Sequence, residues 1–266
     1  CCVSGTVHYP LRRQRQRGIR DRRCSDQLIP ALTINPDFIE WFHRVVAMIA
    51  GFFIIGTAGW AWQRGDSRTT RTAIGAVVVL PLQISIGAIT VTINGLVPWG
   101  YAVPTHAAHL VAALTIFTLL SLTTIYAYRD HHSRPPRARS RRALGAALVA
   151  LLISGLFSRG VPLLQYSTGA QAWYYAVSLV AVVGLLATVY WLADVDRLGR
   201  AAAGSALGIV VVTMLIGRDL VVYTPTVQLL NFGLYLAALG LVAGGLWRLF
   251  GRSQSPTPSF GTEHSE

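Results

Sequence analysis

Seven apolar runs occupy most of the chain, and short polar connections separate them. Roughly 20 predominantly apolar residues in a helix span the hydrocarbon core of a bilayer. The chain is 53% hydrophobic and only 13% charged, whereas an ordinary soluble domain has about 25% charged residues. The pattern therefore predicts an all-α fold, a polytopic membrane helical bundle of about seven transmembrane helices. The runs are residues 41–62, 72–95, 106–128, 142–158, 170–192, 203–222 and 228–250.

The pattern divides the chain into five parts. Residues 1–36 form a polar, Arg-rich segment without the apolar stretch of a signal peptide, and we expect it to be mostly irregular. Residues 37–128 form a first helical half, residues 129–141 a basic loop, and residues 142–250 a second helical half. Residues 251–266 are rich in serine, proline and threonine, a composition that favours disorder.

Charge predicts the orientation of the bundle. The formal net charge of +12 comes from arginine, because the sequence has no lysine. The arginines gather in every second connection, and an excess of this kind is typical of cytoplasmic loops. This distribution favours membrane topology over nucleic-acid binding, and it makes the first and third runs enter from the outer side. Residues 1–36 are an exception, since this orientation places their arginines outside.

A faint internal repeat relates the two halves. In the first half, Gln83-x-x-x-Gly87 precedes a proline-containing connection and then His109. In the second half, Thr213-x-x-x-Gly217 precedes a similar connection and then Asn231. Internal repeats are common in membrane proteins, so the two halves are expected to be related bundles. The second half contains no histidine.

Histidines stand at the start of the first and third runs, where both runs enter from the same side. His43 opens the first run, and His106 and His109 open the third. Two imidazoles at one depth on neighbouring helices can fill both axial positions of one haem. The pair His43 and His109 is therefore a candidate set of haem-iron ligands. The alternative is that each histidine is an interfacial side chain wetted by lipid headgroups.

Two roles are possible for each of the neighbouring polar residues. Glu40 can exchange a proton or stabilise positive charge on a substrate, or it can be an acidic residue favoured at a helix N-terminus. Arg44 can pair with a haem propionate or extend to lipid headgroups. His106 can support a haem, but an interfacial position is preferred. For Gln83, a packing role between helices is favoured over a catalytic one.

Taken together, these residues resemble the haem A synthase family. The resemblance covers residues 24–128. The second half matches the family in the layout of its helices, but its motifs match poorly. The motifs that carry it are Cys24-Ser-Asp-Gln-Leu-Ile-Pro30, Glu40-x-x-His43-Arg44, Gln83-x-x-x-Gly87-Ala-x-Thr90-Val91 and His109-Leu110-x-x-Ala113.

The resemblance implies a membrane oxidoreductase that converts the C8 methyl group of haem O to the formyl group of haem A by successive hydroxylations. It implies that His43 and His109 hold the substrate haem, with Glu40 as the catalytic group at the reacting edge. Haem O synthase and a terminal oxidase are the implied partners. The implied location is the plasma membrane of a prokaryote, with the haem site toward the outer face.

The chain departs from the family pattern in three places. The family has eight helices, and no apolar run precedes Cys24 here. The upstream cysteine that pairs with Cys24 in many members is absent. The resemblance also implies a haem B cofactor held by a second histidine pair, but Trp173 or Tyr174 and Leu230 or Asn231 stand near those positions.

Two other functions remain open from the sequence. One is a haem-binding membrane protein without this reaction, such as an oxidase assembly factor or a b-type electron carrier. The other is a transporter-like helical repeat that binds no haem.

Overall fold

The computed structural model describes residues 36–94, 103–129, 134–158, 167–217 and 224–251 of the 266-residue chain. Within these residues it contains seven α-helices and no β-strand, which confirms the predicted all-α fold. The predictions for the Arg-rich amino-terminal segment and the carboxy-terminal tail lie outside the described residues. The helices are α2 (Pro36–Arg64), α3 (Ser67–Asn94), α4 (Val103–Ala127), α5 (Pro136–Leu156), α6 (Thr168–Trp191), α7 (Arg197–Gly217) and α8 (Pro225–Gly251).

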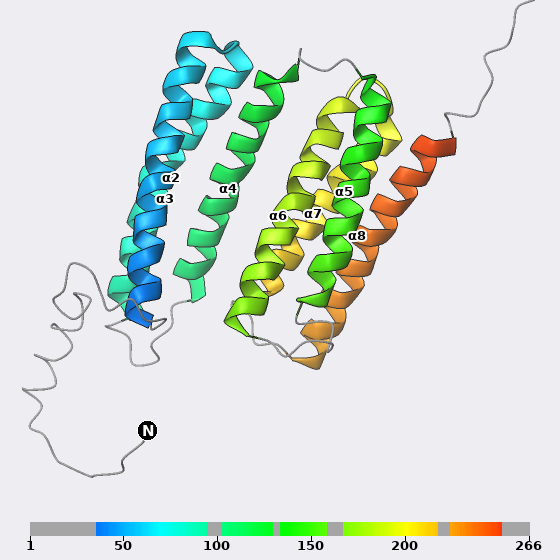
Figure 1. Cartoon of the computed structure of the whole chain (residues 1–266). Helices are drawn as coiled ribbons and strands as arrows, with labels where there is room; N and C mark the ends of the chain where they lie inside the picture. The colour runs from blue at the N-terminus through cyan, green and yellow to red at the C-terminus, as the bar shows by residue number, and fades with distance from the viewer. Residues whose placement is uncertain (1–35, 95–102, 130–133, 159–166, 218–223, 252–266) are drawn as a thin grey trace, which may run out of the picture.

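The helices form two groups that lie side by side (Figure 1). In the first group, α3 packs against both α2 and α4. In the second group, α5 packs on α6, α6 on α7, and α7 on α8, and α8 returns to contact α5. The main contact between the groups is that of α4 with α6. Successive helices run in opposite directions, so α2, α4, α6 and α8 all begin at the same end of the bundle (Figure 1).

The bundle has the surface of a multi-pass membrane protein. Six of the described helices, all except α5, are long and apolar enough to cross a membrane. Their outward side chains are strongly exposed, including Phe53 at 72% and Trp247 at 80%. Exposed apolar surface on this scale is unfavourable in water but is expected where lipid surrounds the helices. The composition of α5 differs because four arginines lie in its first two turns, at positions 137, 139, 141 and 142.

All seven described helices begin before the apolar runs that predicted them. Helix α3 begins at Ser67 rather than at residue 72, and α7 begins at Arg197 rather than at residue 203. Helix α5 begins at Pro136, inside the segment predicted as a basic loop over residues 129–141. The reason is that arginine favours helix formation and can extend its guanidinium to the polar interface while its backbone stays helical. The apolar run therefore marks the lipid-embedded part of a helix and not its first turn.

The two groups differ in their cores. The second group has a continuous core in which Leu144, Leu185 and Val242 are at most 1% exposed. The fully buried hydrophobic cluster of the first group is small and consists of Ile54, Ala76 and Ile116. The first group is therefore the less completely packed of the two, and it is the group that contains both candidate haem ligands.

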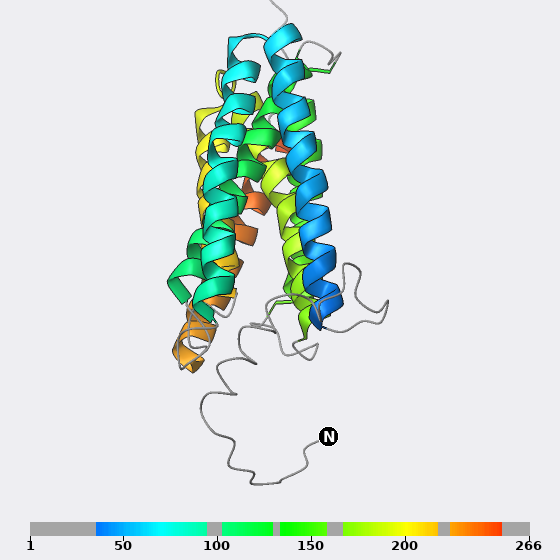
Figure 2. The same ribbon diagram turned by 90° about the vertical axis from the view of Figure 1, so that its left-hand side faces the viewer.

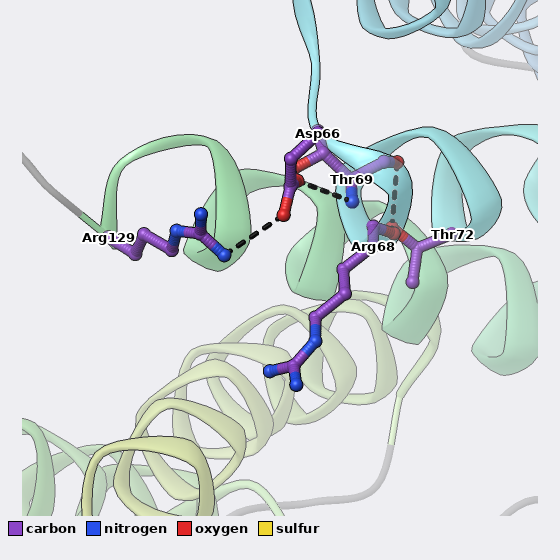
Figure 3. Close-up of polar contacts among 5 residues, drawn as sticks. All are labelled: Asp66, Arg68, Thr69, Thr72 and Arg129. Carbon is purple, nitrogen blue, oxygen red and sulfur yellow. Dashed lines mark hydrogen bonds and ion pairs between the residues drawn. The ribbon is translucent and has the colours of Figure 1, made fainter.

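An aspartate directly precedes α3 in the first group and α7 in the second, and each binds an arginine at or just after the end of its group's last helix. The Oδ1 atom of Asp66 accepts a hydrogen bond from the backbone N–H of Thr69, and Oδ2 lies 2.9 Å from Nη1 of Arg129 (Figure 3). In the second group, Asp196 accepts a hydrogen bond from the N–H of Gly199 and lies 3.1 Å from Nε of Arg248. An acidic residue at this position satisfies free N–H groups of the first helical turn. The repeated contact supports the predicted relationship between the two halves.

Candidate functional site

His43 and His109 lie near the same end of the first helix group. His43 is the eighth residue of α2 and His109 the seventh residue of α4, and both helices begin at the end opposite the arginine-rich one (Figure 1). This relationship follows from the helical hairpin of α2 and α3, which returns the chain to the starting end before α4 begins. The common depth is one requirement of the predicted haem site. Ligation itself stays a prediction.

His109 is held against α3 by a polar contact and by a close approach. Its Nε2 atom lies 3.1 Å from Nε2 of Gln83. An amide nitrogen carries two hydrogens and no acceptor lone pair, so Gln83 donates and Nε2 of His109 accepts. The ring of His109 then carries its hydrogen on Nδ1. The same ring covers Gly87, where an added Cβ atom would lie 3.1 Å from Cε1 of His109.

Gln83 therefore has a more specific role than the helix packing that its sequence position favours. Its side chain lies on α3 and contacts the imidazole of the neighbouring helix α4. Its Oε1 atom is buried, and it has no hydrogen-bond partner among the described residues. A buried acceptor without a partner costs free energy. The site is thus polar on one side and has unused hydrogen-bonding capacity beside His109.

His43 lies on a face of α2 that is covered near one end of the helix and exposed near the other. An α-helix turns about 100° per residue, so residues 43, 50, 54 and 61 share one face. Ile54 and Ala61 on this face are buried, whereas His43 and Ala50 are exposed. The change occurs because α2 and α3 lie together where they are joined and diverge toward the start of α2 (Figure 2). His43 is thus exposed at this end of the first group.

The other predicted site residues surround this pair less closely. Arg44 follows His43 on α2 and is exposed. His106 lies one helical turn before His109 on α4 and is half-buried. Glu40 lies in the second turn of α2, three residues before His43, but its side chain lies outside the described part of the chain. The predicted roles of these three residues stay predictions.

The second group does not fit the haem B cofactor that the resemblance implies. Tyr174 is only 5% exposed, and its ring covers Gly217, where an added Cβ atom would lie 3.2 Å from Cε1 of the tyrosine. Gly217 corresponds to Gly87 in the internal repeat, so a phenol from α6 covers the glycine whose counterpart in the first group is covered by an imidazole from α4. Asn231 is also buried at 4%, whereas the alternative positions Trp173 and Leu230 are exposed at 61% and 54%. The buried residues here offer no imidazole to a haem iron.

The sequence did not show whether Trp173 or Tyr174 faces the interior of the bundle. It left the same question open for Leu230 and Asn231. Both sides of a membrane helix are apolar, so hydrophobic periodicity does not separate a lipid-facing residue from a buried one. The close approach over Gly217 selects Tyr174, and its neighbour Tyr175 donates a hydrogen bond of 2.8 Å to the backbone oxygen of Met214. The signal in the sequence was the glycine itself, because a glycine in a helix often allows a close contact.

The chain is similar to proteins of haem metabolism. The model of the COX15-CtaA family, described as cytochrome oxidase assembly protein, matches residues 33–161. These residues include α2, α3, α4 and α5, and hence both candidate haem ligands. No solved structure matches the chain.

Two named relatives cover different lengths of the chain. Over 83 residues it is 36% identical to a protoheme IX farnesyltransferase of Halobacterium salinarum, a match that covers 31% of this chain and 17% of that protein. Over 195 residues it is 24% identical to a heme A synthase of Halalkalibacterium halodurans, and this match covers 63% of each chain. Residues 33–161 are therefore similar to the COX15-CtaA family of cytochrome oxidase assembly proteins.

Proposed function

We propose that this protein is a haem A synthase-like membrane oxidoreductase that converts the C8 methyl group of haem O to the formyl group of haem A. The haem A supplies a terminal oxidase. His43 and His109 hold the iron of the substrate haem between α2 and α4. The observation that carries this proposal is the contact between Gln83 and His109, which leaves the lone pair on Nε2 of the histidine.

The state of His109 suits a metal ligand. Imidazole binds a metal through an unprotonated ring nitrogen, and the hydrogen bond from Gln83 selects the tautomer with unprotonated Nε2. Metal-binding histidines are usually held by a hydrogen bond from the ring nitrogen that does not bind the metal, whereas Gln83 contacts Nε2 itself. Here the surface over Gly87 fixes the orientation of the ring. Gln83 occupies the ligand position of Nε2 when no metal is bound, and it must give way when iron binds.

The surroundings of His43 suit a flat apolar ligand. Ala47 and Ala50, one and two turns along α2, are exposed and small. On α3, Leu80 approaches Gly51 at the level where α2 and α3 meet, whereas Ile84, one turn further on, is 64% exposed. Small side chains on one helix and an uncovered isoleucine on the other provide apolar walls. A porphyrin buries both of its faces against such walls.

The conversion of a methyl group to a formyl group removes hydrogen and adds oxygen at one carbon. The conversion is a net oxidation, so it would consume an external oxidant and a source of oxygen, and the iron of the bound haem would carry the electrons between them. The chain's own residues position the haem, exclude water with apolar walls, and place a carboxylate beside the reacting edge. Glu40 is the residue in this role, because it precedes His43 by three positions and shares its helix face. Arg44 is the partner of a haem propionate, since guanidinium and carboxylate groups form strong paired hydrogen bonds.

The proposal also includes the orientation of the bundle in the membrane and the source of its haem substrate. The arginine-rich end of the bundle faces the cytoplasm, so the histidines lie toward the outer face of the plasma membrane. One relative is named for transferring a farnesyl group to protoheme IX, and the other for making haem A. We therefore place this protein after a farnesylating enzyme that produces its substrate.

A second function is favoured by one observation. Because the buried pair Tyr174 and Asn231 replaces the second set of histidines, the chain lacks the ligands of the additional haem that the family resemblance implies. A protein with the substrate site alone would bind haem without oxidising it and would act as an oxidase assembly factor.

Haem analysis of cells distinguishes the two functions. The haems of cells that express the protein together with a farnesylating enzyme are extracted and separated by chromatography. Haem A that depends on Glu40 and on both histidines supports the oxidoreductase. Haem bound by the purified protein without haem A in the cells supports the assembly factor. A purified protein with no haem absorbance after incubation with haem contradicts both.

A further inference from the structure

A cavity of about 540 Å³ lies at the arginine-rich end of the bundle, between the two helix groups. It is far from the candidate haem site, because the two lie at opposite ends of the helices. Four arginines line it, and each comes from a different part of the chain. They are Arg68 of α3, Arg129 directly after α4, Arg139 of α5 and Arg200 of α7.

The positive charge of this cavity is only partly compensated. Arg129 pairs with Asp66, and Arg68 extends away from that aspartate instead of binding it (Figure 3). Asp194 is the acidic residue that lines the cavity. In the described part of the chain, Arg68, Arg139 and Arg200 form no ion pair. If Asp66 and Asp194 each neutralise one of the four arginines, two positive charges remain in the cavity.

The surroundings of Arg139 indicate a ligand for a reason separate from the net charge of the cavity. Its guanidinium carbon lies 5.3 Å from the centre of the Trp191 ring, which holds the side chain in place through a cation–π contact. Its Nε atom is buried and has no hydrogen-bond partner among the described residues. A buried charged donor without a partner is costly. An acceptor atom placed in the cavity would satisfy it.

The cavity also has an apolar lining. It includes Leu122, Leu186 and Val189, and the aromatic residues Tyr126 and Tyr190 lie beside them. The two tyrosine rings meet edge to face with their centres 5.2 Å apart, at the contact between α4 and α6. The cavity thus combines cationic and apolar side chains, and this combination matches a molecule that is charged at one end and apolar at the other.

We propose that this cavity binds the phosphate of an anionic phospholipid and that the bound headgroup links the two helix groups. The site lies at the ends of the membrane-spanning segments, Ser67–Thr90 and Pro104–Ala127 among them, which is the depth of phospholipid headgroups. Basic pockets between transmembrane helices on the cytoplasmic side recognise anionic lipids. The arginines of both groups meet around the cavity, so the bound phosphate strengthens a contact that α4 and α6 otherwise carry.

The test is a lipid titration of the detergent-purified full-length protein by native mass spectrometry. Phosphatidylglycerol is compared with phosphatidylcholine, and inorganic phosphate is added in a separate series. Arg139→Gln and Arg200→Gln are compared with Arg142→Gln, which removes an exposed arginine of the same helix that does not line the cavity. We expect the wild type to retain phosphatidylglycerol preferentially, and each cavity variant to weaken its binding about fivefold. Arg142→Gln should bind like the wild type.

Two results would overturn the proposal. Equal retention of phosphatidylglycerol and phosphatidylcholine would show that the cavity does not recognise the anionic headgroup. Displacement of the lipid by millimolar inorganic phosphate would assign the site to a free anion instead. Arg200 is exposed, so its variant should fold even if Arg139→Gln does not. Neither measurement uses haem, so the outcome is independent of the proposed enzymatic function.

Discussion

Nε2 of Gln83 on α3 and Nε2 of His109 on α4 are joined by a hydrogen bond of 3.1 Å. The bond links residues 26 positions apart in the sequence, and it assigns the lone pair of the imidazole to Nε2. Histidine bound in this way has the tautomer that a haem iron requires. Gln83 therefore fixes the tautomer of His109, and it must move aside when iron binds.

The first prediction concerns the tautomer of His109. In the haem-free protein labelled with ¹⁵N-histidine, His109 should show a protonated Nδ1 and an unprotonated Nε2. Gln83→Leu removes the donor while keeping a similar volume, so it should abolish this preference and lower the stability by about 1 kcal/mol. The exposed His43 is the internal control, because its signals should not change in the variant. A protonated Nε2 in the wild type would contradict the assigned hydrogen bond.

The second prediction concerns the space over Gly87. Gly87→Ala places a methyl group 3.1 Å from Cε1 of His109, and the ring has little freedom to move because Gln83 holds it. Displacement of the ring should weaken haem binding about tenfold, since crowding of this kind costs about 1–3 kcal/mol. Haem titration monitored by absorbance measures the effect. Gly59→Ala is the matched control, because its methyl group meets nothing within 4 Å, and an equal loss in both variants would disprove the steric argument.

The third prediction compares the two aspartates that begin α3 and α7. The side chain of Asp196 is 2% exposed, whereas that of Asp66 is 34% exposed. Replacing either with alanine removes a helix cap worth about 1 kcal/mol. Asp196→Ala also leaves the partly buried Arg248 without its partner and should cost about 2 kcal/mol more. Thermal unfolding followed by circular dichroism measures both. Equal melting temperatures for the two variants would contradict the difference in burial.

The fourth prediction is a dependence of stability on pH at Asp66. Hydrogen bonds from the Thr69 side chain and backbone lower the pKa of Asp66 from its ordinary value of 3.8, and the nearby charge of Arg129 lowers it further. A lowered pKa stabilises the folded protein above the ordinary value, and this contribution is lost as the pH falls through the folded value. Asp66→Asn keeps the helix cap but removes the charge. The variant should therefore be slightly less stable than the wild type at pH 7, by less than about 1 kcal/mol. The difference should shrink as the pH falls below 3.8 and vanish once the pH is below the lowered pKa of the folded protein. A difference that persists there would have another cause.

The sequence predicted the helices well because each needs a long apolar run to cross a membrane. Seven runs became seven helices, and the shortest run belongs to α5, whose arginines set it apart from the six helices apolar enough to span. The early start of α5 at Pro136 was missed because a basic segment is equally compatible with a loop and with a helix end at the interface. Charge patterning alone does not separate these two structures.

The candidate site was harder to predict because it depends on contacts between helices. The sequence placed His43 and His109 at one end of the bundle, and the helical hairpin of α2 and α3 places them there. It did not show that Gln83 binds His109, since side-chain direction on a membrane helix is not encoded in an apolar pattern. The inward position of Tyr174 in the second group was hidden for the same reason. The glycines at 87 and 217 were the only local signs of these contacts that the sequence carried.

The most direct test of the central claim is the absorbance spectrum of the purified protein loaded with haem, compared with those of His43→Ala and His109→Ala. Two axial histidines give a six-coordinate, low-spin haem, and loss of either ligand leaves one position open. We predict a low-spin spectrum with one haem per chain at this site in the wild type, and loss of that spectrum in each variant. An unchanged low-spin spectrum in a variant that carries both His43→Ala and His109→Ala would show that these two histidines do not hold the haem iron.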